Sequence, residues 1–137
     1  MTSTERQPAR RGIHPFHALL LGATFPLFLG AALCDYAYMA SYQIEWSLFA
    51  SWLVIGGALF TGLAGLCALL GFFVSDRKGA YAIYLLLLLV VTAIGVLNAL
   101  IHARDAWAMM PSGFIPSIVA AVLGCVVALL GFSRIGV

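Results

Sequence analysis

Three histidines are the residues of this chain best suited to chemistry near neutral pH. His14 and His17 bracket a Pro-Phe pair, and His102 follows a long apolar segment. Imidazole gains or loses a proton in this range and is a common ligand of metals and haem. Because His14 and His17 are three residues apart, both could point the same way at the start of a helix. They could bind a metal, ligate a haem, cap backbone carbonyls, or sit structurally at a membrane surface.

A second group of polar residues surrounds His102. Asn98 precedes it by four residues and Asp105 follows it by three, so all three share one face of a helix. The Asp105 carboxylate could then orient the imidazole, and Asp35 is another carboxylate partner. Together with Arg104 these residues form a predicted polar cluster. It could be a proton relay, a haem or copper ligand set, or a polar lock that fixes the register of helices.

The sequence does not indicate other chemistries. GxSxG, P-loop, dinucleotide-binding and HExxH motifs are all missing from it. The three cysteines lie far apart without a CxxC pair, so neither a metal site nor a disulfide framework is predicted. A net charge of +2 is too small for a nucleic-acid-binding surface. We therefore predict no catalytic residues, no zinc or iron–sulfur site and no nucleic-acid partner.

The elements that must position these residues are apolar and long. The chain is 64% hydrophobic and 9% charged, and residues 18–34, 46–75, 79–101 and 106–133 carry no formal charge. A helix needs about 20 apolar residues to cross a hydrocarbon core of about 30 Å. We predict an all-α, integral-membrane four-helix bundle in a single domain, 14–137, after a basic tail, 1–13. Its helices should span about 15–40, 46–74, 80–103 and 113–133.

The distribution of basic residues predicts the orientation of these helices. Arg104 lies on one side of the bundle, whereas the other side carries Arg6, Arg10, Arg11, Arg77, Lys78 and Arg134. The positive-inside rule then places both termini in the cytoplasm. Leu33 before Cys34 does not form a small-residue cleavage site, so we expect the first span to be retained.

This topology restricts the haem hypothesis. The first and third spans run in the same direction, so His17 and His102 should lie at opposite membrane faces, about 30 Å apart. One haem cannot use both histidines of a single chain. A bis-histidine haem would need a second copy of the chain or another partner.

Small residues recur every four positions in three spans. The sets are Gly57, Thr61 and Gly65; Gly95, Ala99 and Ala103; and Ala120, Gly124 and Ala128. Such stripes let helix backbones approach closely in lipid. They serve packing within the chain and association between chains equally well.

The order of several short motifs resembles a known family. Residues 14–17 (His-Pro-Phe-His), Phe25-Pro26 and Asp35 resemble the opening of a bacterial family of small predicted membrane proteins, the domain of unknown function numbered twenty-two thirty-one. Residues 98–107 and 111–117 are similar to its later half. The resemblance covers nearly all of the chain after about residue 12. Two departures are Ala18, where relatives commonly have proline, and residues 131–134, where many have a Gly-Trp-Leu-Gly segment.

The resemblance implies four membrane helices and no established activity. Some relatives are joined to Rieske or cytochrome-type domains, which implies a redox neighbourhood for them. We expect a multi-pass protein of the bacterial inner membrane whose partners are the lipid bilayer and either itself or another membrane protein, including a redox protein.

Three functions follow from these observations. The first is a non-enzymatic anchor or accessory subunit of a membrane complex, because the small-residue stripes suit packing and no catalytic set is complete. The alternative is an electron carrier that holds haem b through His14, His17 or His102. The second alternative is a small transporter or channel, although the spans lack charges near the middle of the membrane.

Overall fold

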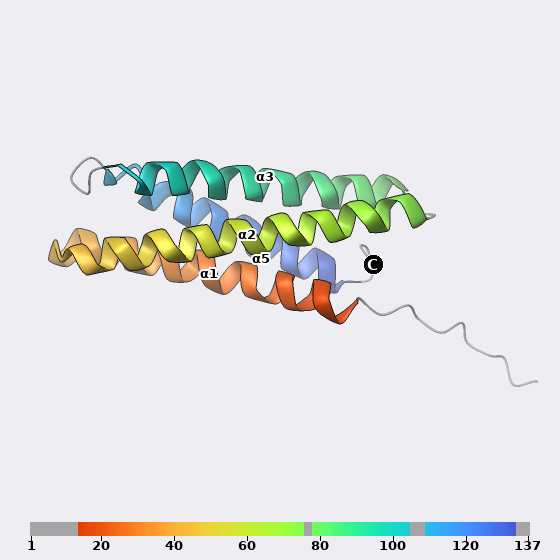
Figure 1. The fold of residues 1–137 in the computed structure, drawn as a ribbon, viewed down its shortest axis with the longest axis horizontal. Coiled ribbons are helices and arrows are strands. Elements are labelled where there is room, and N and C mark those ends of the chain that lie inside the picture. The colour runs from red at the N-terminus through yellow and green to blue at the C-terminus, as the bar shows by residue number, and fades with distance from the viewer. Residues whose placement is uncertain (1–13, 76–77, 105–108, 134–137) are drawn as a thin grey trace, which may run out of the picture.

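The described part of the chain folds into four long helices. The computed structural model describes residues 14–75, 78–104 and 109–133. The helices are α1 (Pro15–Ser41), α2 (Ile44–Val74), α3 (Lys78–His102) and α5 (Phe114–Phe132) (Figure 1). Each is long and apolar enough to cross a membrane. The predicted fold class, an all-α membrane bundle of four helices, is therefore confirmed.

Local sequence explains where the first helix begins and ends. Pro15 occupies the first turn of α1, where its missing N–H removes no helical hydrogen bond. His14 caps the helix, because its side chain accepts a hydrogen bond from the Phe16 N–H at 3.3 Å. At the other end, Tyr42 adopts a left-handed conformation (φ 57°) and α2 begins two residues later. This tight connection makes α1 and α2 an antiparallel hairpin.

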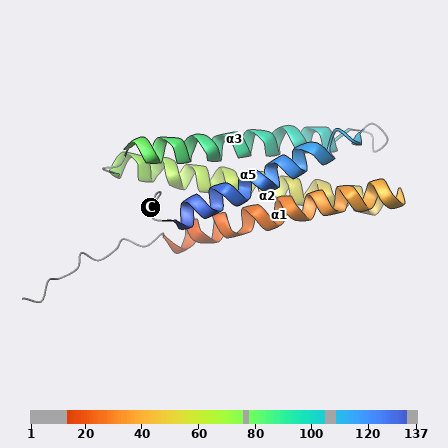
Figure 2. The same ribbon diagram turned by 180° about the vertical axis from the view of Figure 1, so that it is seen from behind.

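The helices surround a common axis in the order α1, α2, α3, α5. Each of α1 and α3 packs against both α2 and α5, so α1 and α3 face each other diagonally across the bundle (Figures 1 and 2). Both run in the same direction. We name one end of the bundle the His17 end, where α1 and α3 begin, and the other the Asp35 end, where they finish. The start of α1 and the end of α5 lie together at the His17 end (Figure 1).

Phe28 fills the axis of the bundle at the midpoint of α1. Its side chain is fully buried. A glycine from each of the other helices faces it: an added Cβ would lie 2.8 Å from the ring at Gly57, 3.0 Å at Gly95 and 3.7 Å at Gly124. These three glycines, one from each predicted small-residue stripe, thus let the backbones close around one aromatic ring. At these positions the stripes serve packing within the chain.

The outer surface of the bundle is apolar. Large hydrophobic side chains are exposed on all four helices, for example Leu33, Leu70, Leu89 and Leu129, each at least 61% exposed. In water such a surface would drive aggregation, whereas in a bilayer it contacts acyl chains. The pattern is that of a multi-pass membrane protein.

Candidate functional site

Asp35 joins three helices at one end of the bundle. Its carboxyl group is fully buried within the interior, on α1. Oδ1 lies 2.8 Å from Nε2 of His102 on α3, and Oδ2 accepts a hydrogen bond from Oγ of Ser117 on α5 at 2.6 Å. Both oxygens are therefore partnered. A buried carboxyl group with this many contacts ties the ends of α1 and α3 to the beginning of α5.

The contact made by Nδ1, the second ring nitrogen of His102, indicates where the protons of this network lie. Nδ1 lies 2.9 Å from the backbone carbonyl of Asn98, which can only accept a hydrogen bond, so Nδ1 carries a hydrogen. One further proton lies between His102 Nε2 and Asp35 Oδ1. The pair is then either an imidazolium with a carboxylate or an imidazole with a carboxylic acid. In both states its net charge is zero.

Asn98 completes the network through its side-chain amide. The amide oxygen and nitrogen both have suitable partners when the amide is flipped by 180°. The nitrogen then donates to the Gly113 carbonyl at 3.1 Å, and the oxygen accepts from the Ser117 backbone N–H at 3.3 Å. Its nitrogen then lies 3.2 Å from His102 Nδ1, farther than the carbonyl that Nδ1 contacts at 2.9 Å. The shorter contact keeps the hydrogen on Nδ1.

Serine, histidine and aspartate meet here in an order that does not activate the serine. In a hydrolytic triad the serine hydroxyl gives its proton to the imidazole and the carboxylate holds the other side of that ring. Here Ser117 and His102 both bond to Asp35, each through a different carboxyl oxygen. Ser117 therefore contacts a carboxyl group and not an imidazole, and the arrangement favours a structural or proton-holding role over nucleophilic catalysis.

The connection before α5 closes over this network. Met109 is fully buried, and its sulfur accepts a hydrogen bond from Ser47 on α2 at 3.7 Å. At Gly113 an added Cβ would lie 2.9 Å from Cε1 of His102, so only glycine lets this backbone cover the imidazole. All four helices thus contribute to the Asp35 end.

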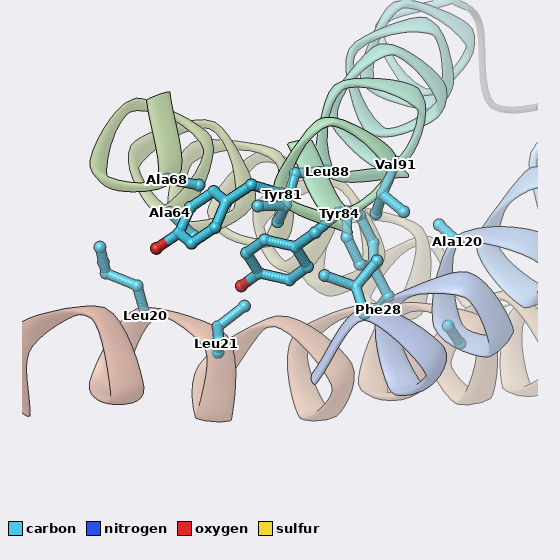
Figure 3. Close-up of a cluster of buried hydrophobic side chains, with 12 residues drawn as sticks. Leu20, Leu21, Phe28, Ala64, Ala68, Tyr81, Tyr84, Leu88, Val91 and Ala120 are labelled. Atoms are coloured by element: carbon cyan, nitrogen blue, oxygen red, sulfur yellow. The ribbon is translucent and has the colours of Figure 1, made fainter. Parts of the chain in front are cut away.

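A simpler contact links the same two helices at the opposite end. His17 on α1 is 5% exposed, and its Nε2 lies 2.8 Å from the hydroxyl of Tyr84 on α3. The two rings meet edge to face, with centroids 6.0 Å apart. Figure 3 shows the Tyr84 ring reaching from α3 towards Leu21 on α1. Nδ1 of His17 is buried without a hydrogen-bond partner.

The two contacts share one register. Asp35 follows His17 by 18 positions, and His102 follows Tyr84 by 18 positions. Eighteen residues are five turns of an α-helix at 3.6 residues per turn, a rise of about 27 Å. The same faces of α1 and α3 therefore meet twice, once near each end of the hydrocarbon layer.

The structure divides the predicted site residues. Asp35, Asn98 and His102 come together, whereas Arg104 is exposed beyond the end of α3, and Asp105 lies outside the described residues. The predicted carboxylate beside His102 is thus present, and it comes from Asp35.

The first two histidines lie in different environments. His14 is exposed and caps α1, while His17 is buried against Tyr84. Pro15 starts the helix between them, so His14 has an extended backbone outside it and His17 lies within the first turn. The difference in backbone conformation gives the two side chains different surroundings.

Ser117 and Tyr84 are the site residues that the sequence analysis missed. Ser117 is a polar residue on the small-residue face of its helix, four positions after Gly113, and this placement is a usable signal. The equal 18-residue spacings from His17 to Asp35 and from Tyr84 to His102 are another. Neither signal identifies the partner residue on another helix unless the register between the two helices is known.

The described residues offer few free ligands for a metal or haem. Both nitrogens of His102 are hydrogen-bonded, and Nε2 of His17 is engaged by Tyr84. Within the described parts of the chain, no group of three histidine, cysteine, aspartate or glutamate side chains is close enough to hold a metal ion. At His102 a haem iron would have to displace a hydrogen-bond partner, whereas His17 keeps Nδ1 without one.

Comparison with known proteins agrees with this picture of a membrane bundle. A family model described as "Predicted membrane protein (DUF2231)" matches residues 13–134. No curated protein and no solved structure matches the chain. The family match confirms the resemblance seen in the sequence motifs. Because it covers nearly the whole chain, including all four helices, the protein belongs to the DUF2231 family of predicted membrane proteins.

Proposed function

We propose that this protein is a non-enzymatic membrane component that anchors or accompanies another membrane protein. The observation that carries this proposal is that the reactive side chains of the interior bond to each other. Asp35, His102 and Ser117 bond across helix boundaries, and Ser117 lacks the imidazole base of a hydrolytic triad. What remains available to other molecules is mainly the apolar outer surface.

The packing at the centre of the bundle argues against a transporter or channel. Phe28 and the glycines around it fill the interior between the two polar ends. Thr24 and Thr61 are buried nearby, but each donates to the carbonyl four residues earlier in its own helix, at 3.0 and 2.7 Å. A permeation path would need polar groups free to bind a solute at this depth.

One observation favours the haem b alternative. Nδ1 of His17 has no hydrogen-bond partner, so this histidine keeps one nitrogen uncommitted near the end of the bundle. A bis-histidine haem would then bind between two copies of the chain or between this chain and another. This arrangement remains the second candidate.

The proposed location is the bacterial inner membrane with both termini in the cytoplasm. The basic residues of the sequence support this orientation. Single cysteines placed at Gln43 and Lys78, in a variant without the three natural cysteines, would test it with a thiol reagent that does not cross membranes. We expect labelling of intact cells at Gln43 alone, and the reverse pattern would contradict the orientation.

Purification at native expression level tests the function. The tagged protein is extracted in a mild detergent, its companions are quantified by mass spectrometry, and visible spectra are recorded before and after dithionite. We expect other membrane proteins in a fixed ratio and no Soret band. A protein that purifies alone with about one haem per one or two chains, or that turns over a substrate, would overturn the anchor proposal. A His17→Leu variant that loses such a band would assign the haem to this histidine.

A further inference from the structure

The contact between Asp35 and His102 holds a single proton in a closed, uncharged network. The two side chains are 0% and 1% exposed, and every hydrogen-bonding atom of the pair has a partner. Adding a proton would leave a net positive charge in the interior, and on Oδ2 it would displace the hydrogen bond that Ser117 now donates there. Removing the proton would leave a net negative charge in the interior, which is costly in a low-dielectric environment.

We propose that Asp35 and His102 form a proton-binding site that keeps α1, α3 and α5 together only while it holds one proton. Loss of this proton and gain of a second both loosen the Asp35 end of the bundle. The site thus makes the junction of these helices, and the Met109–Gly113 connection that covers it, responsive to pH.

The direction of the response follows from counting protons. In an opened junction the side chains meet water, where a free carboxyl group titrates near pH ~3.9 and a free imidazole near pH ~6.5. The open pair therefore holds no proton above about pH 6.5, one proton between these values, and two below about pH 3.9. The closed pair holds one. Opening should be rarest in the middle range and should increase on both sides of it.

Among the residues that the structure describes, few other groups at this end compete with Asp35 and His102 for a proton. On α1, Cys34 is half-buried beside Asp35, and Tyr38 is buried one turn further along. From α2 and α5 the pair is approached by Ser47, through Met109, and by Ser117, neither of which titrates in this range. Among the described charged residues, Glu45 and Arg104 are exposed to solvent at this end.

Hydrogen exchange across a pH series tests the proposal. The full-length protein in lipid nanodiscs is analysed between pH 4 and 9, and amide exchange is corrected for its intrinsic pH dependence. In peptides that cover the end of α3 and the start of α5, opening should increase about tenfold per pH unit above about pH 6.5, since one proton is released. Between about pH 4 and 6.5 it should stay constant.

The variant Asp35→Asn should change the shape of this profile. Its amide can donate to Nε2 and accept from Ser117, so a neutral imidazole satisfies the closed network without the shared proton. Opening should then be constant above about pH 6.5 and increase below it, because the freed imidazole takes up a proton. The wild type and the variant thus respond in opposite regions of the pH scale.

A second variant and a control keep the test decisive. If Asp35→Asn does not fold, His102→Asn takes its place: without the imidazole a closed Asp35 keeps the one proton, so opening should increase from about pH 4 upward and the constant range between about pH 4 and 6.5 should disappear. His17→Gln, at the other end of the bundle, should leave the profile of the Asp35 end unchanged. A flat profile in the wild type, or the same profile in the wild type and in either Asp35 end variant, would overturn the proposal.

Discussion

The two ends of the bundle both link α1 to α3, but they do so with different side chains. At both, a side chain of α1 reaches across the axis to a side chain 67 positions later on α3, at 2.8 Å. The Asp35 end adds Ser117 from α5 and leaves no atom of the pair unpartnered. The His17 end relies on one hydrogen bond to Tyr84, and one imidazole nitrogen has no partner. The same helices thus carry one saturated polar network and one unsaturated contact.

Because of this difference, we expect substitutions to affect the stability of the bundle unequally at the two ends. A saturated buried network loses several hydrogen bonds when one member is removed, and the remaining members stay buried without partners. A single contact loses only itself. We expect the Asp35 end to determine the stability of the bundle, and the His17 end to accept substitutions with smaller losses.

The largest effect is expected for Asp35→Ala. The change leaves His102 Nε2 buried without a partner and removes the hydrogen bond from Ser117, which should lower the free energy of unfolding by about 3–5 kcal/mol. Unfolding in mixed micelles, titrated with a denaturing detergent, measures this loss. Asp35→Asn is the matched control, because its amide keeps both contacts, and it should cost about 1 kcal/mol or less. Equal losses in the two variants would show that the network contributes little.

A smaller loss is expected between the two ends, for Phe28→Ala. In water-soluble cores such a change costs about 3–5 kcal/mol. In a bilayer lipid is as apolar as the interior, so mainly the packing contribution is lost, and we expect about 2–3 kcal/mol. Leu29→Ala, at an exposed neighbour, is the control and should change the same unfolding titration very little. A Phe28 variant as stable as this control would mean that the other helices close the gap.

A still smaller loss is expected at the His17 end for Tyr84→Phe. The substitution removes one hydroxyl and one hydrogen bond, and hydrogen bonds between membrane helices contribute on average about 0.6 kcal/mol. Tyr36→Phe, at an exposed position, corrects for the change of residue type. If Tyr84→Phe proved as harmful as Asp35→Ala, the contrast between the two ends would be wrong.

The smallest effect is the coupling between the ends. Residues more than about 7–10 Å apart without shared partners usually have additive effects, within about 0.5 kcal/mol. The two contacts are separated by about 27 Å along the helices. The double variant Asp35→Asn with Tyr84→Phe should therefore lose the sum of the two single losses. A larger deviation would show that α1 and α3 move as one rigid unit.

Helix spans were predictable because the membrane imposes them. Apolar length and the position of charges indicate four spans, and the observed helices, Pro15–Ser41, Ile44–Val74, Lys78–His102 and Phe114–Phe132, agree with that fold class. Every backbone N–H and carbonyl in lipid must bond within its own helix, so the choice of secondary structure is narrow.

The candidate site was predictable only in part. Asn98 and His102 are one turn apart on α3, and this local relation is visible in the periodicity of the sequence. Asp35 and Ser117 come from other helices, at 67 positions before His102 and 19 after Asn98. Such contacts depend on how far each helix is rotated and shifted, which packing determines, and residue spacing within one helix does not specify it.

The apolar layer around Phe28 also insulates the two polar ends of the bundle from each other. This layer lies between the Asp35 end and the His17 end, so protons of the proposed Asp35–His102 site would exchange with the water on one side of the membrane only. A charge that crosses the whole bilayer gains or loses about 2.3 kcal/mol for each 100 mV of membrane potential. The proton held near Asp35 stays on one side of the insulating layer. Its occupancy therefore follows the acidity of a single compartment, with little influence from the voltage.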